Sequence, residues 1–285
     1  MVRAKRDDAD DLRFDEIGYW SEVKLDIVRE YAAAYSRILA TKRFEYAYID
    51  GFAGSGVHLA KGSQELVPGS PLNALRITPP FQRYFLVDLD GSKVEQLRTF
   101  PEIRDNPDVK LINGDCNKVL LEDVFPLVKY EEYWRALCVL DPYGLHLNWN
   151  VIETAGRMKS IEMFLNFPVM DMNRNALWRK TGGVTAASRA RMTAFWGDES
   201  WKTAAYPKEP TLFGDFDDVK LGNEDVVKAF AERLKSVAGF EFVPDPLPMR
   251  NSTNATVYYL FFASHQTVGA KIVRQILDKY RNRKG

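Results

Sequence analysis

Short apolar runs alternate with helical segments along most of this chain, and that alternation constrains the fold more than any other feature. Apolar runs separated by helices are typical of a parallel sheet, because each crossover helix covers one face of the strands. The runs occupy residues 46–50, 84–88, 109–113, 136–141 and 162–167. The sequence therefore predicts an α/β domain with a mostly parallel sheet and helices on both faces.

The C-terminal part of the chain predicts an antiparallel end to that sheet. Two apolar runs, residues 240–243 and 257–263, follow each other without a helix between them. Helical spacing of apolar residues covers residues 224–237 and 267–281. A C-terminal antiparallel hairpin closing the sheet is the simplest arrangement of these segments.

The chain length of 285 residues suits one large α/β unit with an insertion. Residues 1–17 are charged and irregular, which predicts a flexible tail, and residues 18–167 hold the alternating core. Residues 168–220 carry tryptophans and arginines with little strand patterning, which predicts an insertion or lid. Residues 221–285 would complete the core, and residues 57–69, which contain Gly62, Pro68 and Gly69, would form a loop over the site.

The composition argues against a strongly basic or acidic protein, a disulfide or zinc framework, and a membrane-spanning protein. With 39 basic and 39 acidic residues the formal net charge is zero, so any nucleic-acid or membrane attraction would need a local patch. The two cysteines, Cys116 and Cys138, match no metal or disulfide spacing. The N-terminus has no signal-like apolar stretch, and no run approaches the length of a membrane span. These features predict a soluble, cytoplasmic protein that does not enter a membrane.

A glycine-rich turn directly follows the first apolar run and is the strongest functional signal. Glycines let the backbone turn sharply and let a ligand approach it closely. No Lys-Ser/Thr pair follows the last glycine, which argues against a nucleotide P-loop, and the acidic residue ahead of the glycines suits a ligand with an amino group. The alternative is a purely structural turn. The predicted cofactor contacts here are Asp50, Gly51, Phe52, Ala53, Gly54 and Gly56.

Carboxylates end the next two apolar runs. Asp88 stands where nucleoside binders place an acceptor for ribose hydroxyls, and Leu89 could pack on an adenine ring. Asp115 could accept from an adenine amino group. Each aspartate could instead cap the helix that follows, which is the preferred interpretation for Asp90.

The segment Asp141-Pro142-Tyr143 ends the fourth run, at the sheet edge where α/β folds place their active sites. A carboxylate, a backbone carbonyl and an aromatic ring suit a planar amine, which they would orient toward a methyl donor without first removing a proton. These three residues are the predicted catalytic group. An ordinary tight turn is the alternative, because Asp, Pro and Gly are common turn residues.

Taken together, these motifs resemble the class I S-adenosylmethionine (SAM)-dependent methyltransferases, which have a Rossmann-like sheet. The D-x-F-A-G-S-G and D-P-Y-G motifs are most similar to amine-directed members that modify nucleobases. Similarity to the three-Cys-motif partner family extends from about Trp20 to His265. It rests on residues 24–30 (KLDIVRE), 48–56 (YIDGFAGSG), 140–144 (LDPYG) and 166–175, which begin NFP and end NRN.

The resemblance implies SAM as the cofactor, bound by the glycine turn and Asp88. The family takes its name from a partner protein with a three-cysteine motif that looks like a radical SAM enzyme, so such a partner is a hypothesis for this chain. Nucleobase amine methyltransferases typically carry D/N-P-P-Y/F, whereas here a single proline precedes Tyr143. That departure displaces the ring by one residue.

Substrate contacts are predicted at Arg174, which follows the fifth run, and at His58, which follows the glycine turn. Basic residues near Trp178 and in the last helix could bind nucleic acid, but a solvated surface is the preferred interpretation, because such runs are common on helices. They are Arg174, Arg179, Lys180, Arg189, Arg191, Lys271, Arg274, Lys279, Arg281, Arg283 and Lys284. The scattered histidines make no metal-ligand pattern, so no metal is expected.

Three functions remain open from the sequence. The first is methyl transfer from SAM to an amine of a nucleic acid or another polar substrate. The second is a non-catalytic SAM-binding subunit of a three-cysteine-motif, radical-SAM-like protein. The third is a nucleotide-dependent enzyme, against which the absence of dinucleotide-binding spacing already counts.

Overall fold

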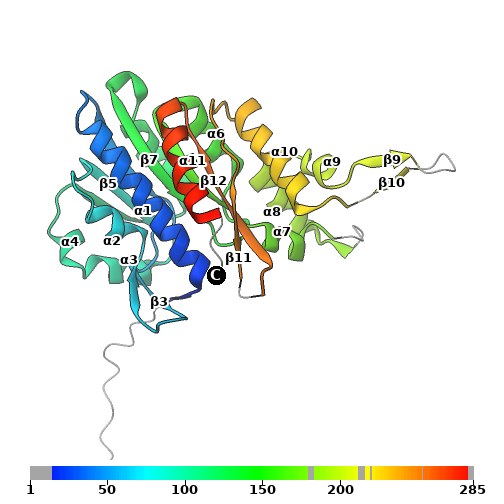
Figure 1. Cartoon of the computed structure of the whole chain (residues 1–285), viewed down its shortest axis with the longest axis horizontal. Helices are drawn as coiled ribbons and strands as arrows, with labels where there is room; N and C mark the ends of the chain where they lie inside the picture. Colours follow the sequence, from blue (N-terminus) through cyan, green and yellow to red (C-terminus); the bar gives the residue numbers. More distant parts are fainter. Residues whose placement is uncertain (1–14, 179–182, 211–215, 219, 252, 282–285) are drawn as a thin grey trace, which may run out of the picture.

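The computed structural model describes residues 15–178, 183–210, 216–218, 220–251 and 253–281. A seven-stranded sheet forms its centre, in the order β11-β12-β8-β7-β2-β5-β6 (Figure 1). The strands are β11 Leu247–Arg250, β12 Thr256–Ala263, β8 Ile161–Phe167, β7 Trp134–Leu140, β2 Glu45–Asp50, β5 Arg83–Asp88 and β6 Val109–Asn113. Strands β8, β7, β2, β5 and β6 pair in parallel, and β12 is antiparallel to both β8 and β11. The predicted Rossmann-like sheet with a C-terminal antiparallel hairpin is confirmed.

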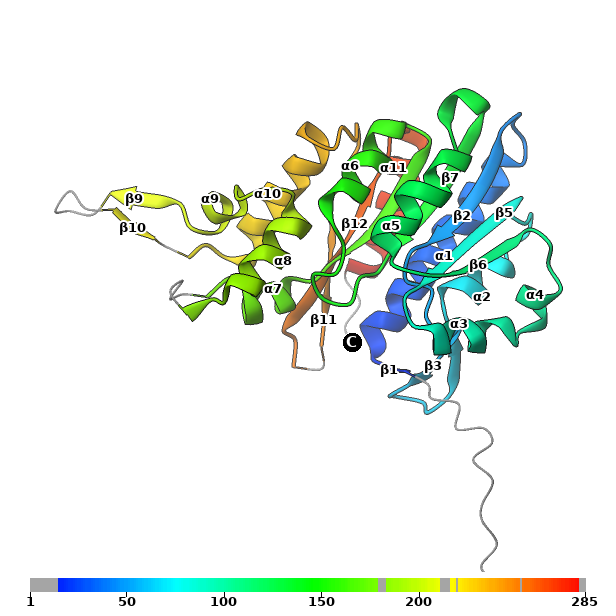
Figure 2. The same cartoon turned by 180° about the vertical axis from the view of Figure 1, so that it is seen from behind.

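Helices cover both faces of the sheet, as the alternation of the sequence predicts. One face carries α1 Tyr19–Leu39, α2 Ser70–Leu75 and α11 Thr267–Arg281, with α3 Gly91–Arg98 and α4 Pro101–Arg104 beside them (Figure 1). The opposite face carries α5 Cys116–Val119, α6 Trp149–Met158, α8 Ala186–Trp196 and α10 Asn223–Ser236 (Figure 2). Each face has its own buried apolar cluster, which is why the strands are apolar on both sides.

Helix α1 shows how the sequence specifies this packing. Val23, Ile27 and Tyr31 recur at helical spacing and are buried against the sheet. The helix begins at Tyr19, and Gly18 occupies its N-cap position. It runs along the central strands in the opposite direction, so its first turns lie near their carboxyl ends and its last turns near their amino ends (Figure 1).

The sheet order creates a crevice between β2 and β7. From β2 the chain first builds outward through β5 and β6, then returns to place β7 on the other side of β2. Ligands of open α/β sheets bind beyond the carboxyl ends of the strands at such a reversal. The glycine turn follows β2 and the Asp141 segment follows β7. Both predicted motifs therefore lie at the carboxyl ends of these two neighbouring strands.

Two segments expected to be irregular form a small second sheet. Asp15–Ile17, assigned to the tail from the sequence, is strand β1 and pairs in parallel with β3 Val57–Ala60. Strand β3 pairs in turn with β4 Leu66–Pro68, so residues 57–69 are mostly strand and not an open loop. Their short length and flanking glycines conceal this pairing in the sequence. The rest of the predicted tail lies outside the described residues.

The final hairpin uses a different first strand from the one predicted. Residues 240–243 contribute only a bridge between Phe242 and Ser264, whereas β11 comprises Leu247–Arg250. Pro248 made that segment an unlikely central strand, but β11 lies at the sheet edge, where a residue without an N–H is tolerated.

Residues 168–220 lie beside the sheet and are largely helical where the structure describes them. They include α7 Val169–Asn175, α8, α9 Trp201–Ala205 and the short antiparallel strands β9 Lys208–Pro210 and β10 Phe216–Asp218. In Figure 2 this part extends outward from the β11 end of the sheet. Trp196 and Trp201 are buried in the core cluster of the α6 face, which ties the region to the sheet.

Candidate functional site

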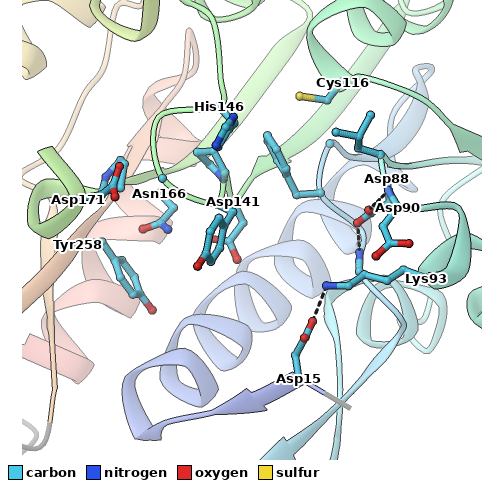
Figure 3. A pocket seen from close by; sticks show the side chains of 18 of the residues that line it. Asp15, Asp88, Asp90, Lys93, Cys116, Asp141, His146, Asn166, Asp171 and Tyr258 are labelled. Carbon is cyan, nitrogen blue, oxygen red and sulfur yellow. Dashed lines mark hydrogen bonds and ion pairs between the residues drawn. The ribbon is translucent and has the colours of Figure 1, made fainter. Parts of the chain in front are cut away.

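A cavity of about 810 Å³ opens at the carboxyl ends of the parallel strands (Figure 3). Its walls come from the turns after β2, β5, β6 and β7 and from α7, so segments far apart in the sequence meet here. The predicted residues that line it are Gly51, Phe52, Gly54, His58, Asp88, Leu89, Asp115, Asp141, Pro142, Tyr143 and Arg174. Asp50, Ala53 and Gly56 do not line it.

Asp50 stabilises the glycine turn through buried hydrogen bonds. Its side chain is fully buried and accepts hydrogen bonds from Ser70 Oγ at 2.6 Å and from the Phe52 amide at 3.2 Å. Burial raises the pKa of Asp50 to about 6, although both hydrogen bonds act to lower it. The expected contact between this carboxylate and a ligand amino group is therefore replaced by an internal role. Ser70 is the first residue of α2, whose N-cap is Gly69.

The glycines of the turn serve two different purposes. Gly54 adopts φ +67°, and a Cβ there would come no closer than 4.0 Å to His58, so it leaves room on the cavity side. Gly56 adopts φ +88°, and a Cβ would lie 2.8 Å from Leu97 Cδ2. Gly56 therefore permits close packing against α3, which explains why it does not reach the cavity.

Asp88 links the second strand to the glycine turn. Its Oδ2 accepts from the Gly54 amide at 2.8 Å and its Oδ1 accepts from the Asp90 amide at 2.9 Å. A carboxylate has about four lone-pair positions, so each oxygen can accept another hydrogen bond from the cavity side. Leu89 beside it is 74% exposed, which is unusual for a leucine and leaves an apolar surface at the cavity wall.

Asp115 and Asp90 both cap helices. Asp115 Oδ1 accepts from the Asn117 amide at 3.0 Å at the start of α5, and Asp90 Oδ1 accepts from the Ser92 amide at 2.9 Å at the start of α3. The cap role predicted for Asp90 is confirmed. Asp115 combines the two alternatives, because it is a helix cap and also lines the cavity.

Asp141 forms an ion pair with Lys24, a residue that the sequence did not single out as functional. The Lys24 ammonium, on α1, donates to Asp141 Oδ2, and the side chains are 13% and 35% exposed. Burial alone would lower the pKa of Lys24, but Asp141, Tyr258 and Asp50 together hold it well above its ordinary value. Lys24 is therefore a fixed cation behind the proposed acceptor site.

Of the remaining D-P-Y-G residues, Pro142 is buried and Tyr143 is exposed at the cavity. The Tyr143 side chain is 90% exposed, so its ring packs against little of the protein. Gly144 adopts φ +62°, and a Cβ there would lie 2.9 Å from Asp171 Oδ2, so this turn fits closely against α7. The ring is available to a ligand but is not held in one stacking position.

Two buried polar atoms in the cavity wall have no hydrogen-bond partner in the described part of the chain. They are Asn166 Oδ1 and His58 Nδ1. Asn166 follows Leu165, which pairs with Leu140, so Asn166 lies beside Asp141 at the sheet edge (Figure 3). A buried polar atom without a partner costs stability, so both positions suit a ligand that supplies the missing contact.

Arg174 lines the cavity from α7, as the sequence predicted for a substrate contact. Its neighbour Trp178 is 40% exposed. Arg179, Lys180, Arg283 and Lys284 of the proposed basic patch lie outside the described residues, so the structure does not delimit that surface.

The charge of the cavity is predominantly negative. Among the residues that the structure describes, six aspartates line it, against one lysine and one arginine. Lys93 is already engaged by Asp15 Oδ2 at 2.6 Å. Such a lining favours a ligand with positive charge and disfavours a polyphosphate.

Several simple alternatives find no structural support among the described residues. No group of three or more His, Cys, Asp or Glu side chains is arranged to hold a metal ion. No helix in those ranges is long and apolar enough to cross a membrane. Cys116, the first residue of α5, and Cys138, on β7, are buried free thiols.

Comparison with known proteins supports the fold. No family model and no curated protein matches the sequence. Protein LPL1258 from Legionella pneumophila, of family model DUF519, superposes with a TM-score of 0.54 and 11% identity, covering 90% of this chain and 91% of its own. The three-Cys-motif partner resemblance stays a prediction.

Weaker structural likenesses include two structures whose names refer to a methyltransferase domain or to bound SAH. The METTL16 MTase domain matches with a TM-score of 0.40 and 11% identity over 83% of this chain and 66% of its own. The N-terminal domain of EvdMO1 with SAH bound matches with a TM-score of 0.39 and 11% identity, over 83% and 79% respectively. TM-scores this low give no information about the function of this chain.

Proposed function

We propose that this chain is a SAM-dependent methyltransferase that acts on an amine of a polar substrate. The observation that carries the proposal is the meeting of two motifs in one cavity: the glycine turn with Asp88, and Asp141 beside Asn166. The first motif suits a nucleoside-bearing cofactor and the second suits an amine.

The cofactor half of the cavity fits SAM by its chemistry. The free lone pairs of Asp88 suit ribose hydroxyls, and the exposed Leu89 side chain suits the face of an adenine ring. The surplus of aspartates complements a ligand that carries a sulfonium and an ammonium group. The same charge argues against NAD or ATP, whose phosphates would be repelled.

The acceptor half of the cavity suits a neutral amine. Lys24 occupies Asp141 Oδ2, which orients the carboxylate and leaves Oδ1 able to accept an amine hydrogen. Asn166 Oδ1, buried without a partner, can accept a second hydrogen. When bound, SAM supplies an electrophilic methyl group that the amine lone pair attacks. Positioning of that lone pair by these acceptors is the main catalytic contribution of the protein in this account.

Tyr143 and Arg174 would contact the substrate at the mouth of the cavity. The exposed ring of Tyr143 can stack on a planar substrate once one is present, and Arg174 can pair with an acidic group of that substrate. A nucleobase amine satisfies both requirements, because it is planar and is attached to a phosphate backbone.

The test is methyl transfer from radiolabelled SAM to separate pools of RNA, DNA and peptides. We expect incorporation in one pool and a loss of at least about 100-fold in Asp141→Asn and Asn166→Ala, because the amine loses its orientation. Binding of S-adenosylhomocysteine should be unchanged in both variants. No transfer to any pool by folded, SAM-binding protein would contradict the enzymatic proposal.

A second candidate is a non-catalytic SAM-binding subunit of a three-cysteine-motif protein. The ion pair between Lys24 and Asp141 favours it, since an engaged carboxylate and an unstacked Tyr143 are also what a binding-only site would retain. In that case Tyr143→Ala would leave the activity of the partner protein in cells unchanged, whereas Asp88→Asn would abolish that activity. Co-purification that never recovers a three-cysteine-motif protein would count against this candidate.

A further inference from the structure

A second cavity, of about 270 Å³, lies at the amino ends of the parallel strands, whereas the glycine turn lies at their carboxyl ends. It is bounded by the last turns of α1, the first turn of α11 and the amino ends of β7 and β8. Its lining includes residues 38, 39 and 272, which are apolar, together with a set of polar and charged side chains. None of these residues belongs to the site described above.

Two buried hydroxyl groups line this cavity without a hydrogen-bond partner in the described part of the chain. They belong to Tyr35, which is 7% exposed, and to Ser160, which is 1% exposed. Hydroxyl groups removed from water normally find a partner, because leaving one unmet costs stability. The cavity therefore suits a ligand that brings hydrogen-bond acceptors to these two hydroxyl groups.

The positive groups of the cavity outnumber the negative ones. Arg135 lies between the rings of Phe44 and Tyr130, with its guanidinium carbon 4.3 and 3.9 Å from their centres. Lys42 and Lys159 also line the cavity, and both are exposed at its rim. Three cationic side chains therefore line a space large enough for a small ring.

Helix α11 adds to this positive field. Gln266, Val268 and Gly269 line the cavity at the start of this helix, where the first amide groups have no partner within the helix and the helix dipole is positive. Among the residues that the structure describes, the one carboxylate in the lining is Glu162. Its oxygens already accept hydrogen bonds from Tyr31 and from Ser264, the latter at 2.9 Å.

We propose that this second cavity binds a small organic oxyanion, with its charged group near Arg135 and its apolar part against α1 and α11. A carboxylate and a phosphate ester share this chemistry, and the hydroxyls of Tyr35 and Ser160 would donate to the oxygens of either one. The inference is independent of methyl transfer, because no residue in it contacts the first cavity.

The probes are benzoate, phenyl phosphate and the neutral isostere benzamide, each titrated against the full chain and followed by ligand-observed NMR. We expect benzoate or phenyl phosphate to bind with a Kd of about 1 mM or tighter and benzamide to bind at least about tenfold more weakly. Comparison of benzoate with phenyl phosphate identifies the preferred oxyanion.

Tyr35→Phe and Ser160→Ala test the position of the ligand. Each variant removes a hydroxyl that has no partner among the described residues, so the Tm should stay the same or rise, while oxyanion affinity falls about tenfold. Asp88→Asn is the matched control in the first cavity and should leave oxyanion binding unchanged. Equal binding of benzoate and benzamide, or oxyanion affinity unaffected by both hydroxyl deletions, would overturn the proposal.

Discussion

Lys24 on the first long helix forms an ion pair with Asp141 at the end of β7, 117 residues further along the chain. The pair joins the helix that covers the sheet to the residue that would hold the acceptor amine. It also places a cation against the carboxylate that the sequence marks as catalytic. We therefore expect both the stability of the fold and the chemistry of the proposed acceptor site to depend on this ion pair.

Loss of Lys24 should destabilise the protein through Asp141. In Lys24→Met the carboxylate loses its partner in a partly buried position, and we expect the free energy of unfolding to fall by about 1–2 kcal/mol, between the values for exposed and buried pairs. The double variant Lys24→Met/Asp141→Asn should recover part of that loss, as urea unfolding would measure. Arg29→Met, at an exposed pair with Asp26 on the same helix, is the control and should have no measurable effect. Additive effects of the two substitutions would show that the pair does not couple them.

The glycines of the turn should differ in their tolerance of a methyl group. Gly56→Ala places a Cβ against buried Leu97 at a positive φ, so we expect a loss of about 2–4 kcal/mol. Gly54→Ala meets only the backbone penalty, about 1 kcal/mol. Gly62→Ala, where no atom lies within 4 Å of the added Cβ, is the control and should not destabilise the fold. Equal losses at Gly54 and Gly56 in thermal unfolding would contradict the packing described for α3.

The buried carboxyl of Asp50 should make stability depend on pH. Its pKa in the folded protein is about 6, above the ordinary value of 3.8, so its contribution is fully present below pH 3.8 and is lost as the pH rises through about 6. The free energy of unfolding of the native chain, relative to Asp50→Asn, should therefore fall between about pH 4 and 7, by at most about 3 kcal/mol. A difference that stays constant across this range would mean that Asp50 does not titrate as its burial implies.

Much of the fold could be predicted because the signals are local. The apolar runs and helical spacings locate the main strands and the helices α10 and α11 closely, since strands buried on both faces admit little else. Strands β1, β3 and β4 were not predicted, because they are short and β3 and β4 have turn residues such as Gly62 and Gly69 close to them. Strand β11 was not predicted, because Pro248 is acceptable only at a sheet edge, and the sequence does not state where the edge lies.

The sequence locates the candidate residues that directly follow a strand. It does not reveal contacts between side chains from elements far apart in the chain. The glycine turn, Asp88 and Asp141 converge on one cavity, as their positions at strand ends imply. Lys24 and Asn166 were present in the segments that carry the family resemblance, but nothing local distinguishes Lys24 from other lysines of α1. The internal role of Asp50 also depends on Ser70, whose approach only the folded chain reveals.

Calorimetric titration with SAM and S-adenosylhomocysteine tests the central claim most directly. The native chain should bind both, and Asp88→Asn should weaken binding at least about tenfold by removing one charge from the ribose contact while its amide oxygen still accepts from the Gly54 amide. ATP and NAD, titrated in parallel, should not compete. Failure of the folded native chain to bind either SAM or S-adenosylhomocysteine, or displacement of them by ATP or NAD, would contradict the assignment of this cavity to SAM.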